Sequence, residues 1–269
     1  MSVQPSRPPP SAEPASTPVL EAVGLTKIYG GVSGARDVSF HARSGQVVGL
    51  IGPNGAGKST VLNCLSGVDR PSSGRVLMRG ADVSALPVHE RARRGMGRTF
   101  QLQRLFPTLT VLENIALPLD DTVLTRIAGG PRSVGGLSRA ERSSKATAAL
   151  ERVGLAGVAK AQVGTLGAGQ MRLVEMARLI AMNVDVLLLD EPAAGLNHGE
   201  GEELFELVSE LAAEGRAVLL VEHRIRSVLR VVRHLVVMDH GAVIAQGPPH
   251  DVMEQAAVQE AYMGKASRA

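Results

Sequence analysis

The residues best suited to chemistry lie in a glycine-rich stretch that ends in lysine, serine and threonine. Residues 52–60 fit the spacing G-x-x-x-x-G-K-[ST] of a loop that binds the phosphates of a nucleotide. Glycines permit tight turns and a close approach of the backbone, so that successive N–H groups can surround an anion. We expect Lys58 to reach the β- and γ-phosphates and the Ser59 hydroxyl to bind Mg²⁺. The expected nucleotide-binding set is Gly52, Pro53, Asn54, Gly55, Ala56, Gly57, Lys58, Ser59 and Thr60.

Two acids and a histidine follow apolar runs further along the chain. Asp190 and Glu191 come directly after the apolar residues 186–189, and His223 comes shortly after those at 217–221. Acidic pairs are common on protein surfaces, but an apolar run before the pair indicates a buried strand. We expect Asp190 to hold Mg²⁺ through water and Glu191 to polarise the attacking water. His223 ends the neighbouring strand, where its side chain can also reach the γ-phosphate.

An aromatic residue ahead of the phosphate-binding loop is a candidate contact for a nucleotide base. Tyr29 is one of only two tyrosines, in a chain that has no tryptophan and 2% aromatic residues. Bases stack on aromatic rings, so Tyr29 could carry the adenine ring. The alternative is that Tyr29 is an ordinary strand residue.

Short strands and helices must position these residues. A β-branched apolar run at 46–51 predicts a strand that enters the loop, and residues 61–65 predict a helix that leaves it. Other expected strands are 19–23, 38–42 and 74–80 in an antiparallel layer, then 186–189, 217–221, 234–239 and 242–246. Expected helices cover 109–115, 138–153, 169–180, 204–211 and 251–263. Strands and helices alternate, which is typical of the α/β class.

Composition bounds the class of protein. With 269 residues and 44% apolar content, the chain can bury a core of Val, Leu, Ile and Ala, which suits a parallel sheet covered on both faces. A net charge of +3 argues against a dedicated nucleic-acid binder. The basic run at 89–94 could touch nucleic acid or lipid headgroups, but a solvated helix face is the favoured interpretation. The single cysteine, Cys64, is expected to pack as a small apolar residue.

The expected organisation is one folded domain with a tail and an internal lobe. Residues 1–18 are rich in proline and are expected to be disordered or polyproline-like. Residues 19–269 form the domain, with a helical lobe at about 100–182 and a glycine-rich flexible loop at 127–136. No apolar run is long enough to span a membrane, and the N-terminus lacks a signal-peptide core, so any membrane-spanning part would belong to another polypeptide.

Together these residues resemble the ATP-binding subunits of ABC transporters, from Leu20 to Met263 and with the motifs in the family order. The resemblance implies a P-loop NTPase core with an antiparallel β layer and an inserted helical lobe. It also implies that Tyr29 stacks on adenine, and that Gln101 is the glutamine that touches Mg²⁺ and senses the permease. Glu191, His223, Lys58 and Gln101 would be the catalytic set. Residues 166–170 take the place of the signature loop, so that Gly167, Ala168, Gly169 and Gln170 would cover ATP bound to a second subunit.

A finer resemblance points to the larger ATPase subunit of branched-chain amino acid importers. It rests on residues 98–101, 104–106, 110–114, 190–197 and 261–264, much of which related importers of urea, amides and small carboxylates share. The implied cofactors are ATP and Mg²⁺. The implied partners are transmembrane permeases, an identical or paralogous second ATPase subunit and, indirectly, a substrate-binding protein. The implied location is the cytoplasmic face of the inner membrane, where the subunit is peripheral.

Two departures from the family pattern concern contacts across the expected dimer. Gly167 stands where the signature serine normally donates to the γ-phosphate, and Asn197 replaces the usual aspartate after Glu191. The branched-chain branch tolerates both kinds of change, so an active ATPase is still expected. The main alternative is a soluble ABC ATPase that acts on DNA, ribosomes or cluster assembly. A catalytically poor regulatory subunit is a weaker alternative that only Gly167 suggests.

Overall fold

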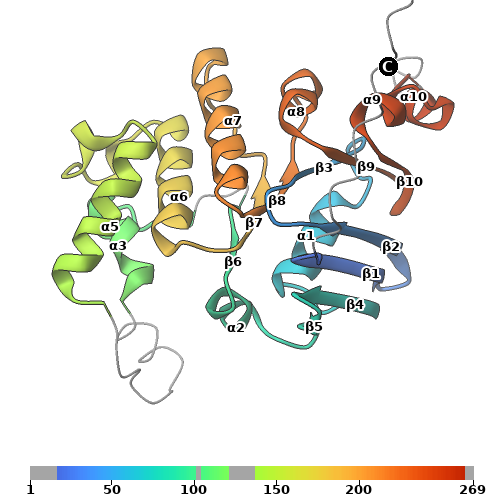
Figure 1. The fold of residues 1–269 in the computed structure, drawn as a ribbon, viewed down its shortest axis with the longest axis horizontal. Helices are drawn as coiled ribbons and strands as arrows, with labels where there is room; N and C mark the ends of the chain where they lie inside the picture. Colours follow the sequence, from blue (N-terminus) through green and yellow to red (C-terminus); the bar gives the residue numbers. More distant parts are fainter. Residues whose placement is uncertain (1–16, 101–103, 121–136, 264–269) are drawn as a thin grey trace, which may run out of the picture.

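The computed structural model describes residues 17–100, 104–120 and 137–263, which form two β-sheets and a group of helices beside them (Figure 1). The strands are β1 (Leu20–Tyr29), β2 (Val32–Ala42), β3 (Val47–Ile51), β4 (Ser73–Met78), β5 (Ala81–Asp82), β6 (Met96–Arg98), β7 (Val186–Asp190), β8 (Ala217–Val221), β9 (His234–Asp239) and β10 (Ala242–Gly247). The α-helices are α1 (Lys58–Ser66), α2 (Val88–Arg93), α3 (Val111–Ala116), α5 (Arg139–Arg152), α6 (Ala168–Met182), α7 (His198–Ala213), α8 (Ile225–Val231), α9 (Pro249–Met253) and α10 (Ala256–Met263). Short 3₁₀ turns cover Leu117–Leu119, Ala156–Val158 and Val163–Thr165.

The central sheet has the strand order β10-β9-β3-β8-β7-β6, in which only the β10–β9 pair is antiparallel. Its middle strands are buried on both faces, because alternate side chains enter two different cores. In β3, Val47 and Ile51 face one core while Val48 and Leu50 face the other. The predicted α/β class is confirmed. The predicted strands that end near the candidate residues are confirmed as well.

Layers cover both faces of this sheet. α7 and α8 lie on one side, and α1 lies on the other between the central sheet and the four-stranded sheet β2-β1-β4-β5 (Figure 1). The pairs of the smaller sheet are antiparallel, as expected from the alternating apolar pattern. Its first strand is longer than predicted and continues to Tyr29, where a hairpin returns to Val32.

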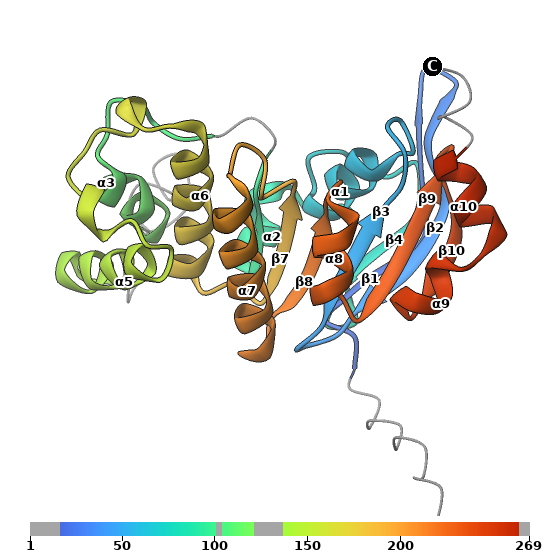
Figure 2. The same cartoon turned by 90° about the horizontal axis from the view of Figure 1, so that it is seen from above.

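Helices α3, α5 and α6 gather at one end of the molecule (Figure 2). Thr110 and Ser138 each begin a helix with a capping box, in which the hydroxyl and a glutamate three residues later satisfy backbone N–H groups in both directions. Ala146 and Leu150 of α5 are buried in the same core as Val174 and Met176 of α6. None of the described helices is long and apolar enough to cross a lipid bilayer.

The structure corrects two predictions, and some others concern residues outside the described part of the chain. The basic run at 89–94 is not simply a solvated face, because Arg91 is only 1% exposed and donates to the carbonyls of Ser84, Leu86, Cys64 and Leu65. The predicted terminal helix is two helices, because the helical conformation is interrupted at residues 254–255. Cys64 is buried as expected. The tail, apart from its last two residues, and the glycine-rich stretch 127–136 lie outside the described part of the chain.

Candidate functional site

The phosphate-binding loop connects β3 to α1, with backbone angles that only glycine adopts readily. Gly52 has φ +152° and Gly57 has φ +99°. A Cβ on Gly52 would lie 2.1 Å from the Met238 carbonyl oxygen, and one on Gly57 would lie 2.3 Å from that of Gly34. These glycines are therefore required by contact with neighbouring strands as well as by the turn itself. α1 begins at Lys58, so its first N–H groups point into the loop.

The lysine of this loop is held inside it. Lys58 is only 6% exposed, and its Nζ donates to the carbonyl oxygens of Gly52 at 2.7 Å and Pro53 at 3.0 Å. A buried ammonium group at the start of a helix creates a strongly positive site. This is the electrostatic environment that a polyphosphate requires.

A cleft of about 420 Å³ joins this loop to residues from distant parts of the sequence. It is lined by Val32, Ser33, Gly34, Asn54, Gly55, Ala56, Gly57, Lys58, Ser59, Thr60, Glu191, Val221 and His223. The structure therefore brings two of the candidate catalytic side chains, Glu191 and His223, to the phosphate-binding loop. Positive and acidic groups in one polar cleft can hold a phosphate chain and a water molecule next to it.

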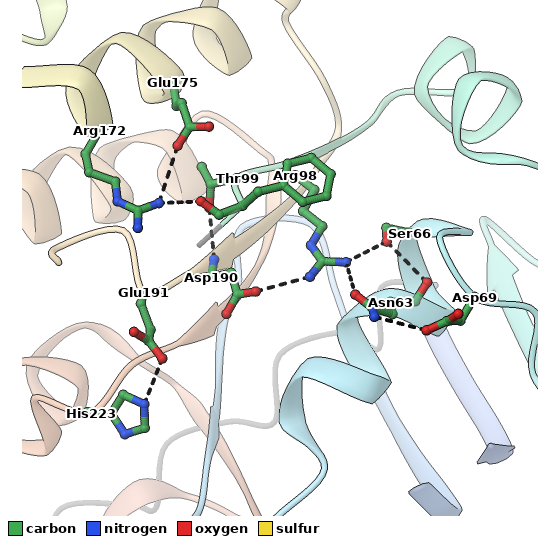
Figure 3. Close-up of polar contacts among 11 residues, drawn as sticks. Asn63, Ser66, Asp69, Arg98, Thr99, Arg172, Glu175, Asp190, Glu191 and His223 are labelled. Carbon is green, nitrogen blue, oxygen red and sulfur yellow. Dashed lines mark hydrogen bonds and ion pairs between the residues drawn. The ribbon is translucent and has the colours of Figure 1, made fainter. Parts of the chain in front are cut away.

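Glu191 and His223 contact each other across the ends of two adjacent strands. The Glu191 Oε1 and His223 Nε2 atoms are 2.8 Å apart (Figure 3). Glu191 has φ +49°, an unusual angle for a residue with a Cβ, and its N–H donates to the Val221 carbonyl at 2.9 Å. Such strain is retained where the surrounding structure fixes the residue, and here it directs the carboxylate into the cleft.

Asp190 is buried beside the cleft and does not line it. Its side chain is 2% exposed, and its Oδ2 lies 3.1 Å from an Arg98 Nη atom. Burial raises the pKa of the Asp190 carboxyl, while the charge of Arg98 opposes this effect. The other oxygen, Oδ1, is also buried and has no hydrogen-bond partner among the described residues. A buried carboxylate oxygen without a hydrogen-bond partner is suited to bind a cation through a water molecule.

The donor set around Asp190 suits Mg²⁺ better than a metal that needs many protein ligands. The described residues contain no group of three or more His, Cys, Asp or Glu side chains placed to hold a metal ion. Mg²⁺ is usually held by one or two carboxylates together with substrate phosphates and water. Asp190 and the Ser59 hydroxyl match that requirement.

Tyr29 lies at the end of β1, close to the rim of the cleft. Its ring is near Gly34 and Thr60, because a Cβ built on Gly34 would meet Tyr29 Cε2 and Thr60 Oγ1 at 2.9 Å each. Burial and a 2.6 Å hydrogen bond from the hydroxyl to Asp69 raise the pKa of Tyr29 to about 12, so the phenol stays neutral. Lys27 Nζ lies over the ring, 5.0 Å from its centroid. Stacking on adenine would therefore use the face that Lys27 does not cover.

The substitution Tyr29→Ala tests whether the ring binds adenine. Base stacking is worth about 1–3 kcal/mol, so the variant should bind ATP roughly 5- to 150-fold more weakly. Tyr29→Phe keeps the ring, loses the hydroxyl bond to Asp69, and should bind ATP nearly as well as the wild type. Isothermal titration of the three proteins measures the difference. Equal affinities in all three would show that Tyr29 does not stack on the base.

The sequence analysis assigned no role in the site to several buried polar residues around the cleft. The Arg98 guanidinium bonds to Asp190 and to α1, and Thr99 Oγ1 accepts from the Asp190 N–H at 2.9 Å. Glu222 is also buried, and its carboxylate accepts from the backbone N–H groups of Ala193 and His223, both at 3.0 Å. The position of Glu222 after an apolar strand was the available signal, because that placement had already singled out Asp190 and Glu191.

The remaining predicted residues lie elsewhere. Gly167 precedes α6, and Gln170 Oε1 accepts from its N–H at 3.3 Å, but neither lines the cleft. Gly167, Ala168 and Gln170 are exposed, and Gly169 is half-buried. Asn197 caps α7 by accepting from the Glu200 N–H at 3.0 Å, a role that aspartate fills equally well. Gln101 lies outside the described residues.

Comparison with known proteins finds a matching family, similar sequences and similar structures. Residues 35–194 match the family described as "ABC transporter". The chain is 40% identical to the "High-affinity branched-chain amino acid transport ATP-binding protein BraF" of Pseudomonas aeruginosa, over 93% of this chain and 100% of that protein. It is similar to the ADP conformation of MJ1267, an ATP-binding cassette of an ABC transporter, with TM-score 0.80, 31% identity and coverage of 93% and 100%. It is also similar to the dimeric post-hydrolysis cassette MJ0796 bound to ADP and Pi, with TM-score 0.75, 28% identity and coverage of 86% and 98%.

Proposed function

This chain belongs to the ABC transporter family as an ATP-binding subunit, and we propose that it hydrolyses ATP to power an importer of branched-chain or related small amino acids. The observation that carries the proposal is the single cleft in which the phosphate-binding loop meets Glu191 and His223. The choice of substrate class is supported by the likeness to BraF over nearly the whole chain. In transporters of this type the transported molecule is selected by other subunits, so this chain supplies the chemistry and not the selectivity.

In the proposed reaction, each residue of the cleft has one task. The loop N–H groups and Lys58 hold the phosphates of ATP, and Tyr29 holds the adenine ring. Glu191 accepts a hydrogen bond from the attacking water and polarises it. His223, which is 2.8 Å from Glu191, donates to the γ-phosphate and keeps the carboxylate aligned. Positioning and electrostatic stabilisation are the main sources of rate in phosphoryl transfer, and this cleft supplies both.

We propose that Mg²⁺ is held by the Ser59 hydroxyl and, through water, by Asp190, with Gln101 as a further ligand. The unpartnered Oδ1 of Asp190 supports this assignment. When bound, the ion would neutralise negative charge on the β- and γ-phosphates.

The proposed active unit is a pair of ATPase subunits. Gly167 to Gln170 start α6 among the helices at one end of the molecule, away from α1 in both views (Figures 1 and 2). They do not line the cleft of their own chain, and we propose that they cover ATP bound to a partner subunit. The likeness to a dimeric cassette supports this arrangement. The second ATPase subunit would be an identical chain or a paralogue.

The proposed membrane partners dock on the helical lobe, at the cytoplasmic face of the inner membrane. A cavity of about 390 Å³ between α3 and α5 is lined by apolar side chains that include Leu112 and Leu117 and by charged ones that include Arg142. Phe106, next to this region in sequence, is 51% exposed. Exposed apolar surface with a polar rim is typical of a docking site for another protein.

Reconstitution tests the transport role against the alternative of a free-standing ATPase. The chain should bind ATP, hydrolyse it slowly alone, and co-purify with its permeases when these are co-expressed. Turnover should rise when a substrate-loaded binding protein is added to the complex in vesicles. Gln101→Ala should reduce that stimulation and change ATP affinity little, since Lys58 and the loop hold the phosphates without it.

A free-standing ATPase would give a different result. In a free-standing ATPase, Gln101→Ala would lower basal hydrolysis, and no membrane protein would be recovered with the chain. Glu203→Gln, an exposed change of charge on α7, serves as the control and should alter neither property.

A further inference from the structure

We infer that Arg98 is a positioning residue for the metal site, which orients the Asp190 carboxylate so that one oxygen remains available to the hydrated Mg²⁺. The inference rests on the proposed role of Asp190 as a metal ligand. Arg98 would not touch the ion or the nucleotide. It would act entirely through the side chain that does.

The position of Arg98 follows from the pairing of two strands. β6 lies parallel to β7 at the edge of the central sheet, with Arg98 opposite Leu188. The next residue continues the contact, because the Thr99 N–H donates to the Leu188 carbonyl at 3.0 Å. Thr99 Oγ1 also accepts from the Asp190 N–H at 2.9 Å. Residues at the end of β6 therefore form hydrogen bonds with both the backbone and the side chain of Asp190.

The guanidinium of Arg98 bridges two parts of the nucleotide site. One nitrogen, Nη1, donates to Asn63 Oδ1 at 2.8 Å and to Ser66 Oγ at 2.9 Å, both on α1 (Figure 3). The other, Nη2, donates to Asp190 Oδ2 at 3.1 Å. Since α1 is the helix that starts at Lys58, Arg98 links the phosphate-binding helix directly to the strand that carries Asp190. The two anchors on α1 leave the guanidinium little freedom to rotate.

This bridge determines which oxygen of Asp190 is available. Figure 3 shows one carboxylate oxygen bonded to Arg98 and the other turned away from it. That second oxygen, Oδ1, has no hydrogen-bond partner among the described residues even though it is buried. A buried carboxylate that could rotate freely would present either oxygen, whereas one that is fixed by a guanidinium presents one. Partners that orient metal ligands in this way usually contribute 10- to 100-fold to metal affinity.

A lysine could not reproduce these contacts. The guanidinium is planar and offers donors in fixed directions, so it can contact α1 and Asp190 at once. The lysine side chain is shorter than that of arginine, and its ammonium group keeps the positive charge. It lacks the separate nitrogens that contact Asn63, Ser66 and Asp190. Arg98→Lys therefore separates orientation from charge.

The hydrogen bonds continue from Arg98 toward the base-binding side. Asn63 Nδ2 donates to Asp69 Oδ2 at 3.0 Å, and the same oxygen accepts from the Tyr29 hydroxyl at 2.6 Å. The polar network thus extends from Tyr29, the candidate adenine contact, to Asp190, the candidate metal ligand. Its centre is Arg98, which bonds to both α1 and β7.

The test measures how much Mg²⁺ is needed to tighten binding of AMP-PNP, a non-hydrolysable ATP analogue. Affinity is determined in EDTA and then at increasing Mg²⁺ concentrations by isothermal titration. In Arg98→Lys, the Mg²⁺ concentration for half-maximal tightening should rise about 10- to 100-fold. Affinity in EDTA should stay within about twofold of the wild type, because the loop and Lys58 are unchanged. Equal losses with and without Mg²⁺ would show a merely structural role and contradict the inference.

Arg91 provides a matched control. It is a second buried arginine that braces the end of α1, through the Cys64 and Leu65 carbonyls at 2.7 and 2.6 Å. Its guanidinium donates to backbone carbonyls and not to Asp190. Arg91→Lys should lower the melting temperature and leave the Mg²⁺ requirement of the folded protein unchanged. If Arg91→Lys raised the requirement as much as Arg98→Lys, bracing of α1 would explain both effects and the inference would be wrong.

Two further variants keep the test decisive. Ser66→Ala removes one anchor of Arg98 and should raise the Mg²⁺ requirement roughly 2- to 10-fold, even if Arg98→Lys does not fold. Asp190→Asn tests the metal role of Asp190 separately from the positioning role of Arg98. If Asp190→Asn leaves the Mg²⁺ requirement unchanged, the proposed metal role of Asp190 is wrong. If Asp190→Asn abolishes the Mg²⁺ effect while Ser66→Ala and any folded Arg98→Lys match the wild type, only the inference about Arg98 is wrong.

Discussion

Glu191→Gln should lower ATP turnover by roughly 10²–10⁴ and leave ATP affinity close to that of the wild type. This is about 3–5 kcal/mol of the activation barrier. Glutamine has nearly the same shape and can still bond to His223, which is 2.8 Å from the carboxylate, so the cleft should keep its form. The amide is a poor base, however, and cannot polarise water as a carboxylate does. Steady-state phosphate release and an ATP titration measure the two quantities.

The same variant should accumulate as an ATP-bound dimer, because hydrolysis is the step that reopens the pair. Size-exclusion chromatography with ATP detects this species. Glu203→Gln changes the charge by the same amount on the exposed face of α7 and should remain active and open normally. Wild-type turnover in a clean preparation of Glu191→Gln would show that another group polarises the water.

Much of the candidate site could be predicted from the sequence because its residues come at or shortly after the ends of strongly patterned strands. Ile51 precedes the phosphate-binding loop, Leu189 precedes Asp190, and Val221 lies two residues before His223. Because β3, β7 and β8 are adjacent and parallel, their carboxyl ends meet at one edge of the sheet. Local pattern and sheet topology together therefore explain why residues far apart in sequence line one cleft.

The buried arginines could not be predicted in the same way. Arg91 and Arg98 occur in basic or polar segments that resemble exposed surface, yet both are buried against α1. Their burial depends on carbonyl and side-chain acceptors that only the tertiary fold places nearby. A sequence window shows the charge of an arginine but not the acceptors that offset its desolvation.

The end of the chain shows a second limit of pattern-based prediction. Residues 251–263 have helical periodicity, but the structure divides them between α9 and α10. α9 begins earlier, at Pro249, whose fixed φ suits the first turn of a helix. α9 packs against β9 and β10, and α10 contacts β10, so the course of the chain along the sheet sets the break rather than local propensity.

Uptake by living cells tests the proposed importer role most directly. A chain that supplies the energy for import should be required for uptake even though it does not bind the transported molecule itself. Cells that lack the chain should therefore lose high-affinity uptake of labelled leucine, isoleucine or valine. Expression of the wild type should restore uptake, whereas Glu191→Gln at equal abundance should not, because binding of ATP without hydrolysis cannot complete the cycle. Unchanged uptake of every small amino acid, amide and urea tested in the deletion strain would contradict the account.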